Sequence, residues 1–168
     1  NQDVALIDIE SGEITDLTCS GYSDGNFKWA LGGKAMTWES DKNGYRSHGS
    51  WGAESDIYIM FFDTEAMTDF DRSKEEKEIE KMYKSSRELK KEEKQEKKDS
   101  LNAKKNKTEK VELTLEGREY RIVRLTPHSN MLGDHYLSED GQKLYFTQRL
   151  ERGYDLCVMD LEEGSVRV

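Results

Sequence analysis

The sequence lacks the features that define several broad classes of protein. Its 168 residues include only two cysteines, Cys19 and Cys157. Two are too few for a disulfide framework, although the sequence alone leaves one bridge between them open. Cys157 lies in an apolar run and is expected to pack as a small hydrophobic residue. No stretch is long and apolar enough to form a membrane-spanning helix, so we expect no membrane partner.

Positive charge is also scarce outside one segment. The chain has a net charge of −9. Residues 64–110 hold 15 Lys and Arg against 13 Asp and Glu, whereas the remaining residues hold 11 and 22. Nucleic-acid binding requires a basic surface, so we predict no nucleic-acid partner. An acidic surface suits a cationic partner, and it also confers solubility.

A short motif recurs three times. Residues 3–12 read D-V-A-L-I-D-I-E-S-G, and residues 155–164 read D-L-C-V-M-D-L-E-E-G. The copy at 56–63, D-I-Y-I-M-F-F-D, matches the first half and then diverges. The pairs Leu17-Thr18 and Leu125-Thr126 form a second recurring landmark. Self-similarity of this kind indicates an array of supersecondary units.

Each unit continues in the same order after its Leu-Thr pair. An aromatic residue follows about a dozen positions later, at Trp29 and Tyr136, and then a polar turn containing Gly33 or Gly141. We expect both glycines to adopt positive φ, because tight turns require it. The strands predicted after these turns cover residues 35–39 and 143–147. Together with the Asp-initiated strand, the pattern predicts four antiparallel strands per unit.

Four strands in about 40–45 residues are typical of a β-propeller blade. The sequence therefore predicts an all-β fold, a partial propeller of about two and a half blades with a charged helical insertion. The predicted units are residues 1–18, the last two strands of one blade, residues 17–126, a blade with the insertion, and residues 125–168, the following blade.

Two and a half blades cannot close a propeller, which needs at least about four. We therefore expect this chain to be a fragment of a longer protein, and its start at Asn1 without an initiator Met agrees. A fragment beginning inside a blade would also lack any signal peptide of its parent. The other interpretation is that exposed edge strands pair with a second copy, which makes a homo-oligomer the expected assembly.

The insertion at 64–110 departs from the repeat. Ser73-Lys-Glu-Glu76 is a capping-box pattern and predicts a helix from about 73 to about 99. The apolar residues predicted to pack along one face of this helix are Ile79, Met82, Tyr83 and Leu89. The tail to Lys110 is expected to be flexible, because it has little apolar area to bury. A solvated insertion is the simpler interpretation, and a docking arm for a partner subunit is the alternative.

After the insertion the chain is expected to return to the sheet. Val111–Leu115 alternates apolar and polar residues, and Gly117 turns the chain. Residues 120–125 are predicted to form the outer strand of the same blade, so the insertion lies between the third and fourth strands. A loop between strands is a position where insertions are tolerated.

The loop around Arg46, Ser47, His48 and Trp51 places a serine beside a histidine. A nucleophile needs a base within hydrogen-bond reach and a third group that orients the base, which adjacent residues on one loop rarely provide. We predict no catalytic residue here. Packing around Trp51 is the first interpretation, and contact of Arg46, His48 and Trp51 with a peptide or a neighbouring domain is the second.

His128, Asp134 and His135 have side chains of the metal-binding type, but their spacing fits no standard ligand pattern, so we predict no metal and no other cofactor. Blade packing or lining of a propeller channel is expected instead, with His128 and His135 as candidate peptide or domain contacts. The three aspartates that end the apolar strands, Asp8, Asp63 and Asp160, are expected to cap turns. The aromatic residues expected in the core are Trp29, Trp38 and Tyr145.

The repeat resembles the TolB-like, or PD40, propeller repeat through Asp56-Ile-Tyr-Ile-Met60 and Asp155-Leu-Cys-Val-Met-Asp160. The whole chain resembles tricorn-like peptidases more closely, through residues 44–52, 58–63 and 120–126 and the helix start at Ser73. Such proteins carry propellers, a PDZ domain and a C-terminal serine-peptidase domain. Nothing in this chain matches the catalytic motifs of that domain.

The resemblance implies a non-catalytic propeller segment of a serine peptidase of the S41 type. Its partners would be peptides or unfolded polypeptide, guided to a separate catalytic domain, and other domains of the parent chain. A TolB-like interaction module with no peptidase activity is the alternative, and an oligomerisation piece that docks through the charged helix is another. The sequence leaves the compartment open between cytoplasm and periplasm.

Overall fold

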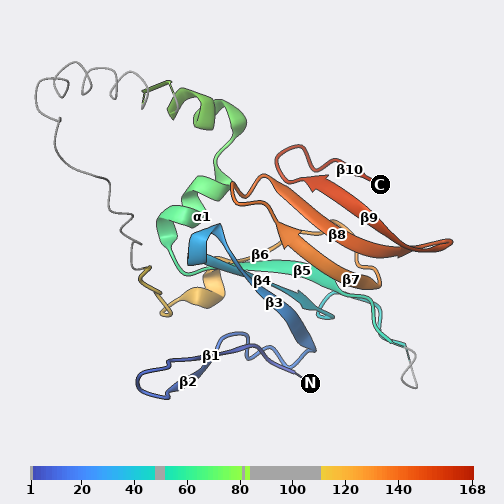
Figure 1. Cartoon of the computed structure of the whole chain (residues 1–168), viewed down its shortest axis with the longest axis horizontal. Coiled ribbons are helices and arrows are strands. Elements are labelled where there is room, and N and C mark those ends of the chain that lie inside the picture. The colour runs from blue at the N-terminus through green and yellow to red at the C-terminus, as the bar shows by residue number, and fades with distance from the viewer. Residues whose placement is uncertain (1, 48–51, 81, 84–110) are drawn as a thin grey trace, which may run out of the picture.

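The computed structural model describes residues 2–47, 52–80, 82–83 and 111–168. Its strands form three antiparallel sheets, so the all-β prediction is confirmed. Sequence-neighbouring strands lie beside one another in every sheet, as a chain of hairpins requires. The helical segments lie at one end of the sheets (Figure 1).

The first sheet follows the chain in the order β3-β4-β5-β6. Its strands are β3 (Asp24–Ala30), β4 (Ala35–Ser40), β5 (Asp56–Phe61) and β6 (Ile122–Arg124). A 3₁₀ turn, Leu31–Gly33, joins β3 to β4, and Gly33 has a φ of 91°, as predicted. The insertion leaves the sheet after β5 and returns at β6, which confirms its predicted place between the third and fourth strands.

The second sheet has the order β10-β9-β8-β7. Its strands are β7 (Leu132–Leu137), β8 (Lys143–Leu150), β9 (Gly153–Asp160) and β10 (Val166–Arg167). The β7–β8 turn contains Gly141 with a φ of 70°, again as predicted. The N-terminal hairpin, β1 (Ala5–Ile7) paired with β2 (Ile14–Asp16), forms a separate two-stranded sheet.

The two four-stranded sheets pack face to face through one apolar core. Alternate residues of a strand point to opposite faces, so each sheet contributes every second residue. The first sheet contributes Ile57, Ile59 and Phe61, and the second contributes Leu144, Phe146, Cys157 and Met159. Cys157 is fully buried, as expected, and both cysteines are free thiols.

A second core lies on the other face of the first sheet. Trp38, Met60 and Phe62 pack there against Val4 and Leu17 of the N-terminal segment. The first sheet is therefore covered on both faces, by the N-terminal hairpin on one side and the second sheet on the other (Figure 1).

The recurring Asp and Thr landmarks form the same hydrogen-bonded clasp in two places. The Thr126 hydroxyl accepts from the Ile57 N–H and donates to the Asp56 carboxylate at 2.8 Å. In the N-terminal segment, the Thr18 hydroxyl accepts from the Val4 N–H at 3.0 Å and donates to Asp3. In both places the threonine follows one strand of an antiparallel pair, and it is hydrogen-bonded to residues at the start of the other strand.

The aspartates that end the repeated motif cap local structure, as predicted. Asp8 accepts from the N–H groups of Glu10 and Ser11, and Asp160 accepts in the same way from two following residues. Asp63 instead accepts from the Glu65 N–H and caps helix α1 (Thr64–Asp71). The divergent second copy of the motif therefore leads into a helix rather than a turn.

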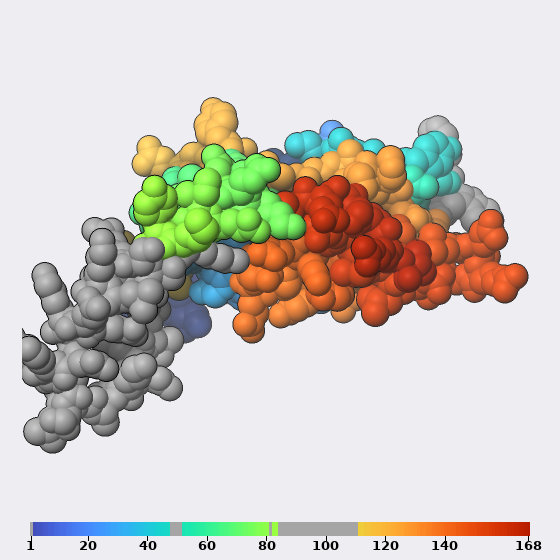
Figure 2. All heavy atoms as spheres, turned by 90° about the horizontal axis from the view of Figure 1, so that it is seen from above, coloured from blue at the N-terminus to red at the C-terminus, as the bar shows by residue number. Residues whose placement is uncertain are grey.

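Helix α1 was not predicted, and it belongs to the core. Ala66 is buried, and Met67 and Phe70 pack against the cluster between the two sheets. The Phe61 and Phe70 rings lie 5.2 Å apart. A space-filling view from above shows this helical segment against the second sheet (Figure 2). The simpler interpretation of residues 64–110, a solvated insertion, is therefore wrong for this part.

The predicted helix start at Ser73 is confirmed. The Ser73 N–H donates to the Glu76 carboxylate and the Glu76 N–H to the Ser73 hydroxyl, which is a capping box, and residues 74–80 are helical. The expected packing is wrong: Ile79 and Tyr83 are largely exposed, and Met82 is exposed as well. Leu89 and the remainder of the predicted helix and tail lie outside the described residues.

Other expectations need correction. Arg118–Arg121 is a 3₁₀ turn, so the outer strand covers Ile122–Arg124 rather than the predicted 120–125. Trp38 is buried, but Trp29 is 54% exposed and Tyr145 is 37% exposed. Within the described residues, no helix has both the length and the apolar character needed to cross a membrane.

Candidate functional site

A buried polar contact joins the two four-stranded sheets beside their apolar core. His135 on β7 is 2% exposed. Its Nε2 lies 3.0 Å from the Thr37 Oγ1, and its Nδ1 lies 3.2 Å from the Glu39 Oε1, both on β4. An ionised carboxylate can only accept, so its contact with Glu39 places a proton on Nδ1. The single proton of the Thr37 hydroxyl has two acceptors in reach, the His135 Nε2 and the Lys28 carbonyl oxygen at 3.5 Å.

Hydroxyl, imidazole and carboxylate follow one another here in the order of a nucleophile, its base and the acid that orients the base. Thr37 is 1% exposed, and both Thr37 and His135 lie between the packed sheets. No substrate carbonyl reaches a hydroxyl in that position, so the arrangement is a structural tie between sheets. This agrees with the packing interpretation of His135.

Charged side chains surround this tie at the surface. Asp134 pairs with Lys28, and Asn26 donates to both Glu39 and Asp134. The hydrogen bond from Lys28 lowers the pKa of Asp134 to about 2. Because β3 supplies Asn26 and Lys28 and β7 supplies Asp134, the pairing holds one edge strand of each sheet together.

The loop that follows β4 carries Arg46, one of the predicted contact residues. Arg46 donates to Asp41 at 2.5 Å, and its guanidinium lies 5.5 Å from the centre of the Tyr22 ring. Ser55 and Asn130 exchange backbone hydrogen bonds, which brings this loop beside the segment before β7. The loop lies at the end of the sheets opposite α1 (Figure 1).

The structure separates the residues singled out from sequence. Arg46 is tied to Asp41, His128 is exposed, and His135 is buried between the sheets. His48 and Trp51 lie outside the described residues. The role of these five residues in contacting a peptide or a neighbouring domain stays a prediction.

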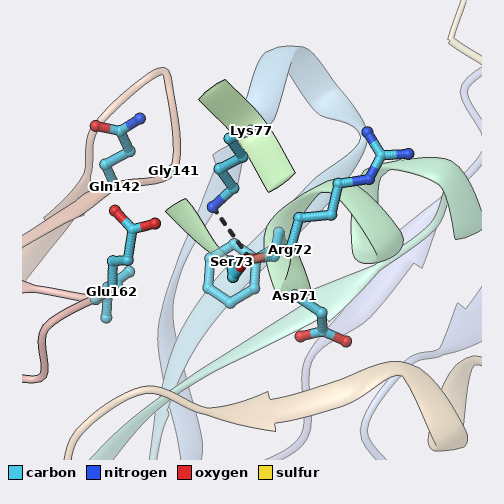
Figure 3. A pocket seen from close by; sticks show the side chains of 9 residues that line it. Asp71, Arg72, Ser73, Lys77, Gly141, Gln142 and Glu162 are labelled. Atoms are coloured by element: carbon cyan, nitrogen blue, oxygen red, sulfur yellow. Dashed lines mark hydrogen bonds between the residues drawn. The ribbon is translucent and has the colours of Figure 1, made fainter. Parts of the chain in front are cut away.

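A shallow cleft of about 280 Å³ lies at the opposite end, between the helical segment and the second sheet. Figure 3 shows Lys77 of the helical side lying towards Gln142 and Glu162, which belong to turns of the second sheet, whereas the Arg72 and Asp71 side chains extend away from these two residues. The Lys77 ammonium donates to the Phe70 carbonyl at 3.5 Å. The lining mixes both signs of charge and supplies no nucleophile with a neighbouring base.

Nothing among the described residues points to metal chemistry. No group of three or more His, Cys, Asp or Glu side chains in that part of the chain is placed to hold a metal ion. What the described surface offers is hydrogen bonding, charge and aromatic contact, which are the means of binding.

Comparison with known proteins gives a fold but no family. No protein-family model matches the chain, and no curated protein shows significant similarity to it. A solved structure described as the tricorn protease matches with a TM-score of 0.56 over 99% of this chain, at 11% identity. The chain spans 15% of the length of that structure. The fold is thus similar to part of the tricorn protease, and at this identity the likeness concerns the fold alone.

Proposed function

We propose that this chain is a β-propeller segment of a tricorn-like peptidase, and that it guides peptides towards a separate catalytic domain. The observation that carries the proposal is the fold likeness to the tricorn protease, which extends over 99% of the chain. Within this proposal, each four-stranded sheet is a blade, and the N-terminal hairpin is part of the preceding one.

The packing of the sheets supports the propeller interpretation. Propeller blades are four-stranded antiparallel sheets placed side by side around an axis. Here two such sheets stack in chain order, the hairpin covers the free face of the first, and the Asp–Thr clasp recurs at equivalent places. The motif that begins at Asp155 supplies the equivalent strand of the second sheet.

The absence of catalytic geometry among the described residues supports a guiding rather than a hydrolytic role for this segment. The hydroxyl–imidazole–carboxylate set at Thr37 is sealed between sheets. Acidic residues dominate the chain outside 64–110 and would attract the basic parts of peptides.

The encoding reading frame beyond Val168 tests the proposal. A PDZ-like segment followed by a serine-peptidase domain is the expected result, and full-length protein with the 1–168 segment removed should then hydrolyse long peptides less selectively. A frame that ends after a few more strands would contradict the peptidase proposal. It would favour the TolB-like interaction module, whose partner a pull-down would identify.

A second candidate, an oligomerisation segment, is favoured by the helix that begins after Ser73. Ile79 is 51% exposed and Tyr83, one turn later, is 74% exposed, so they form an apolar stripe at the surface. A second copy of the chain is the occupant that this candidate requires. Deleting residues 73–105 should then lower the mass in solution by sedimentation analysis, and an unchanged mass would reject the idea.

A further inference from the structure

A cavity lies on the first sheet, beside the loop that follows β2. It has a volume of about 320 Å³ and opens where the loop after β2 crosses the ends of β3, β4 and β5. The side chains that matter here are three aromatic residues and three charged ones: Tyr22, Trp38, Tyr58, Asp24, Lys42 and Glu119. A volume near 300 Å³ is at the small end of ligand sites and suits one amino-acid side chain.

Asp24 gives this cavity a buried acceptor that lacks a donor. The residue is 3% exposed. Its Oδ2 accepts from the Ser20 hydroxyl at 2.5 Å, whereas its Oδ1 has no hydrogen-bond partner among the described residues. Buried carboxylate oxygens are normally satisfied, because an unpaired one loses its hydration without compensation. The unpaired oxygen therefore indicates a donor from outside the described residues.

The aromatic walls favour a donor that carries positive charge. Trp38 and Tyr58 stack with their ring centres 5.7 Å apart and present their ring system to the cavity. Tyr22 already holds the Arg46 guanidinium over one face of its ring. Aromatic faces attract cations, and they do so more strongly where water is excluded.

The charge balance of the lining points the same way. Asp24 and Glu119 are acidic and Lys42 is basic, so the lining has an excess of one negative charge. An anionic ligand would meet two carboxylates, and a neutral ligand would leave the Asp24 carboxylate unpaired. A compact ammonium group fits the volume, the acceptor and the aromatic walls together.

We propose that this cavity binds a primary ammonium group, from either a lysine side chain or the N-terminus of a peptide. The ammonium would donate to the Asp24 Oδ1, and its alkyl chain would lie against Trp38 and Tyr58. The inference goes beyond the proposed function, because it depends only on the cavity and would hold equally for a module without a peptidase.

The loop over the cavity contains Cys19, whose thiol can report ligand binding. Asp24 Oδ1 is enclosed, so an ammonium group reaches it by displacing the loop that contains Ser20 and Tyr22. Cys19 in this loop is exposed and has a φ of 41°, whereas Cys157 is buried. Ligand binding should therefore change the reaction rate of the Cys19 thiol with a maleimide, with Cys157 as the unreactive reference.

Titration of the whole chain with four probes tests the proposal. The probes are N-acetyl-lysine methylamide, its ε-acetylated form, N-acetyl-norleucine methylamide, and norleucine methylamide with a free α-amine. The first should bind at least tenfold more tightly than the second and third in calorimetry, if a lysine side chain is the source. Preferential binding of the fourth would assign the site to a peptide N-terminus.

Two variants and a control locate the binding. Asp24→Asn should weaken ammonium binding at least tenfold, and Lys42→Gln should strengthen it by removing a like charge. Glu13→Gln removes one exposed carboxylate outside the cavity lining and should leave binding unchanged. Circular dichroism checks that each variant folds, and the comparison of probes on the wild-type chain does not depend on the variants.

Equal binding of the charged and acetylated probes would overturn the proposal, as would the absence of binding by any probe at millimolar concentration. In either case the Asp24 Oδ1 would be satisfied by buried water. Binding that survives Asp24→Asn in a folded variant would also reject the site. These outcomes leave the proposed propeller function untouched, since that is tested by the reading frame.

Discussion

At the scale of single residues, the repeated aspartate and threonine form the same hydrogen bond in two places. Asp56 is fully buried, and its carboxylate accepts from the Thr126 and Ser129 hydroxyls and from Arg124. Asp3 accepts from Thr18 and from the Ser20 N–H in the equivalent place. A buried charge is tolerated when hydrogen bonds surround it, which explains why Asp recurs at the start of an apolar strand.

The Thr126→Val substitution tests this clasp. It removes a buried hydroxyl that serves Ile57 N–H and Asp56 at once, so both groups lose a partner. The expected cost is about 1–3 kcal/mol in the free energy of unfolding. Urea denaturation measures it. Thr18→Val is the matched control: it breaks a clasp nearer the solvent and should cost less, and equal costs would contradict the importance of burial.

The pairing of Asp134 with Lys28 predicts a pH dependence. The pKa of Asp134 in the folded chain is about 2, below the ordinary value of 3.8. A carboxyl with a lowered pKa stabilises the fold above its unfolded-state pKa and loses that contribution as pH falls through the folded value. The stability difference between wild type and Asp134→Asn should therefore shrink between pH 4 and pH 2.

The difference in stability between wild type and Asp134→Asn should be small at neutral pH. Asp134 is well exposed, so water screens its interaction with Lys28. Thermal unfolding of both proteins at pH 6, 4, 3 and 2 measures it. Asp140→Asn is a useful comparison, since the Ser138 hydroxyl rather than a lysine is the main group that lowers the pKa of Asp140. A constant gap between wild type and Asp134→Asn would contradict the assignment.

Some residues were placed correctly from the sequence, and others could not be. The capping roles of Asp8, Asp63 and Asp160 depend on neighbours in the chain, which the sequence shows directly. The partners of His135 lie on β4, nearly one hundred residues away, and no local pattern connects them. The sequence likewise gives no sign that one carboxylate oxygen of Asp24 has no hydrogen-bond partner among the residues that the structure describes.

Trp29 shows how spacing alone misleads. Trp29 and Tyr136 stand at similar distances from their Leu-Thr pairs, yet Trp29 pairs with Met36 and Tyr136 with Tyr145. Met36 faces the N-terminal hairpin, whereas Tyr145 lies on the free face of the second sheet. Both β3 and β7 contain register shifts, and a slip of one residue moves a side chain to the other face.

At the scale of elements, helix α1 connects the two sheets. Phe70 of α1 and Leu31 of the β3–β4 turn both approach Gly141 in the β7–β8 turn. A Cβ at Gly141 would lie 3.1 Å from a Leu31 methyl and 3.6 Å from the Phe70 ring. The short helix therefore closes one end of the inter-sheet core, and it needs the space that glycine leaves.

Gly141→Ala should destabilise the chain for two reasons. The residue has a φ of 70°, which costs about 1 kcal/mol for a residue with a Cβ, and the added methyl crowds Leu31. Gly164→Ala is the control, since its φ is 68° but nothing lies within 4 Å of its Cβ. Chemical denaturation should show a larger loss for Gly141→Ala, and equal losses would reject the close docking of α1 on the turn.

A pair of deletions separates α1 from the rest of the insertion. Removing residues 73–105 leaves Ala66, Met67 and Phe70 in the core and should change the unfolding free energy by about 1 kcal/mol or less. Removing residues 64–105 takes these side chains away. It should cost at least about 3 kcal/mol, the usual effect of deleting one buried aromatic side chain. Similar stability of the two deletions would show that α1 packs only loosely.

The sequence predicted most strands and missed this helix for a physical reason. The strands at 35–39 and 143–147 carry apolar residues between polar turns, and both were found within β4 and β8. Helix α1 is short, and its cap Asp63 occupies the place where the other copies of the motif make a turn. Its apolar residues gain their stability from packing between sheets, which local propensity does not report.

At the scale of the whole molecule, each sheet has two faces. We call the face towards the preceding unit of the chain the backward face, and the face towards the following unit the forward face. Ile57 and Ile59 of the first sheet face forwards and are covered by the second sheet. The residues equivalent to these in the repeat, Leu156 and Val158, lie on the free face of the second sheet, where Leu156 is 63% exposed. Tyr145 adds to the same face through its pairing with Val158.

The face of the N-terminal hairpin that points away from the first sheet also has exposed apolar side chains. Val4 and Leu6 pack on the first sheet, so Ile7 and its partner Ile14 point away, and they are 58% and 69% exposed. The chain thus offers a forward apolar face at one end and a backward one at the other. Two different surfaces of this kind allow head-to-tail contact between copies.

We therefore expect the isolated chain to associate head to tail as its concentration rises, with the face around Leu156 of one copy on the hairpin of the next. Leu156→Lys and Ile14→Lys should each reduce the average mass measured by sedimentation, because each places a charge in the contact. An equimolar mixture of the two variants should form dimers and no larger species, since one intact face remains on each partner. Exposed Ile9→Lys, outside both strands of the hairpin, is the control. A mass unaffected by either face variant would show that the repeated packing does not extend beyond the chain.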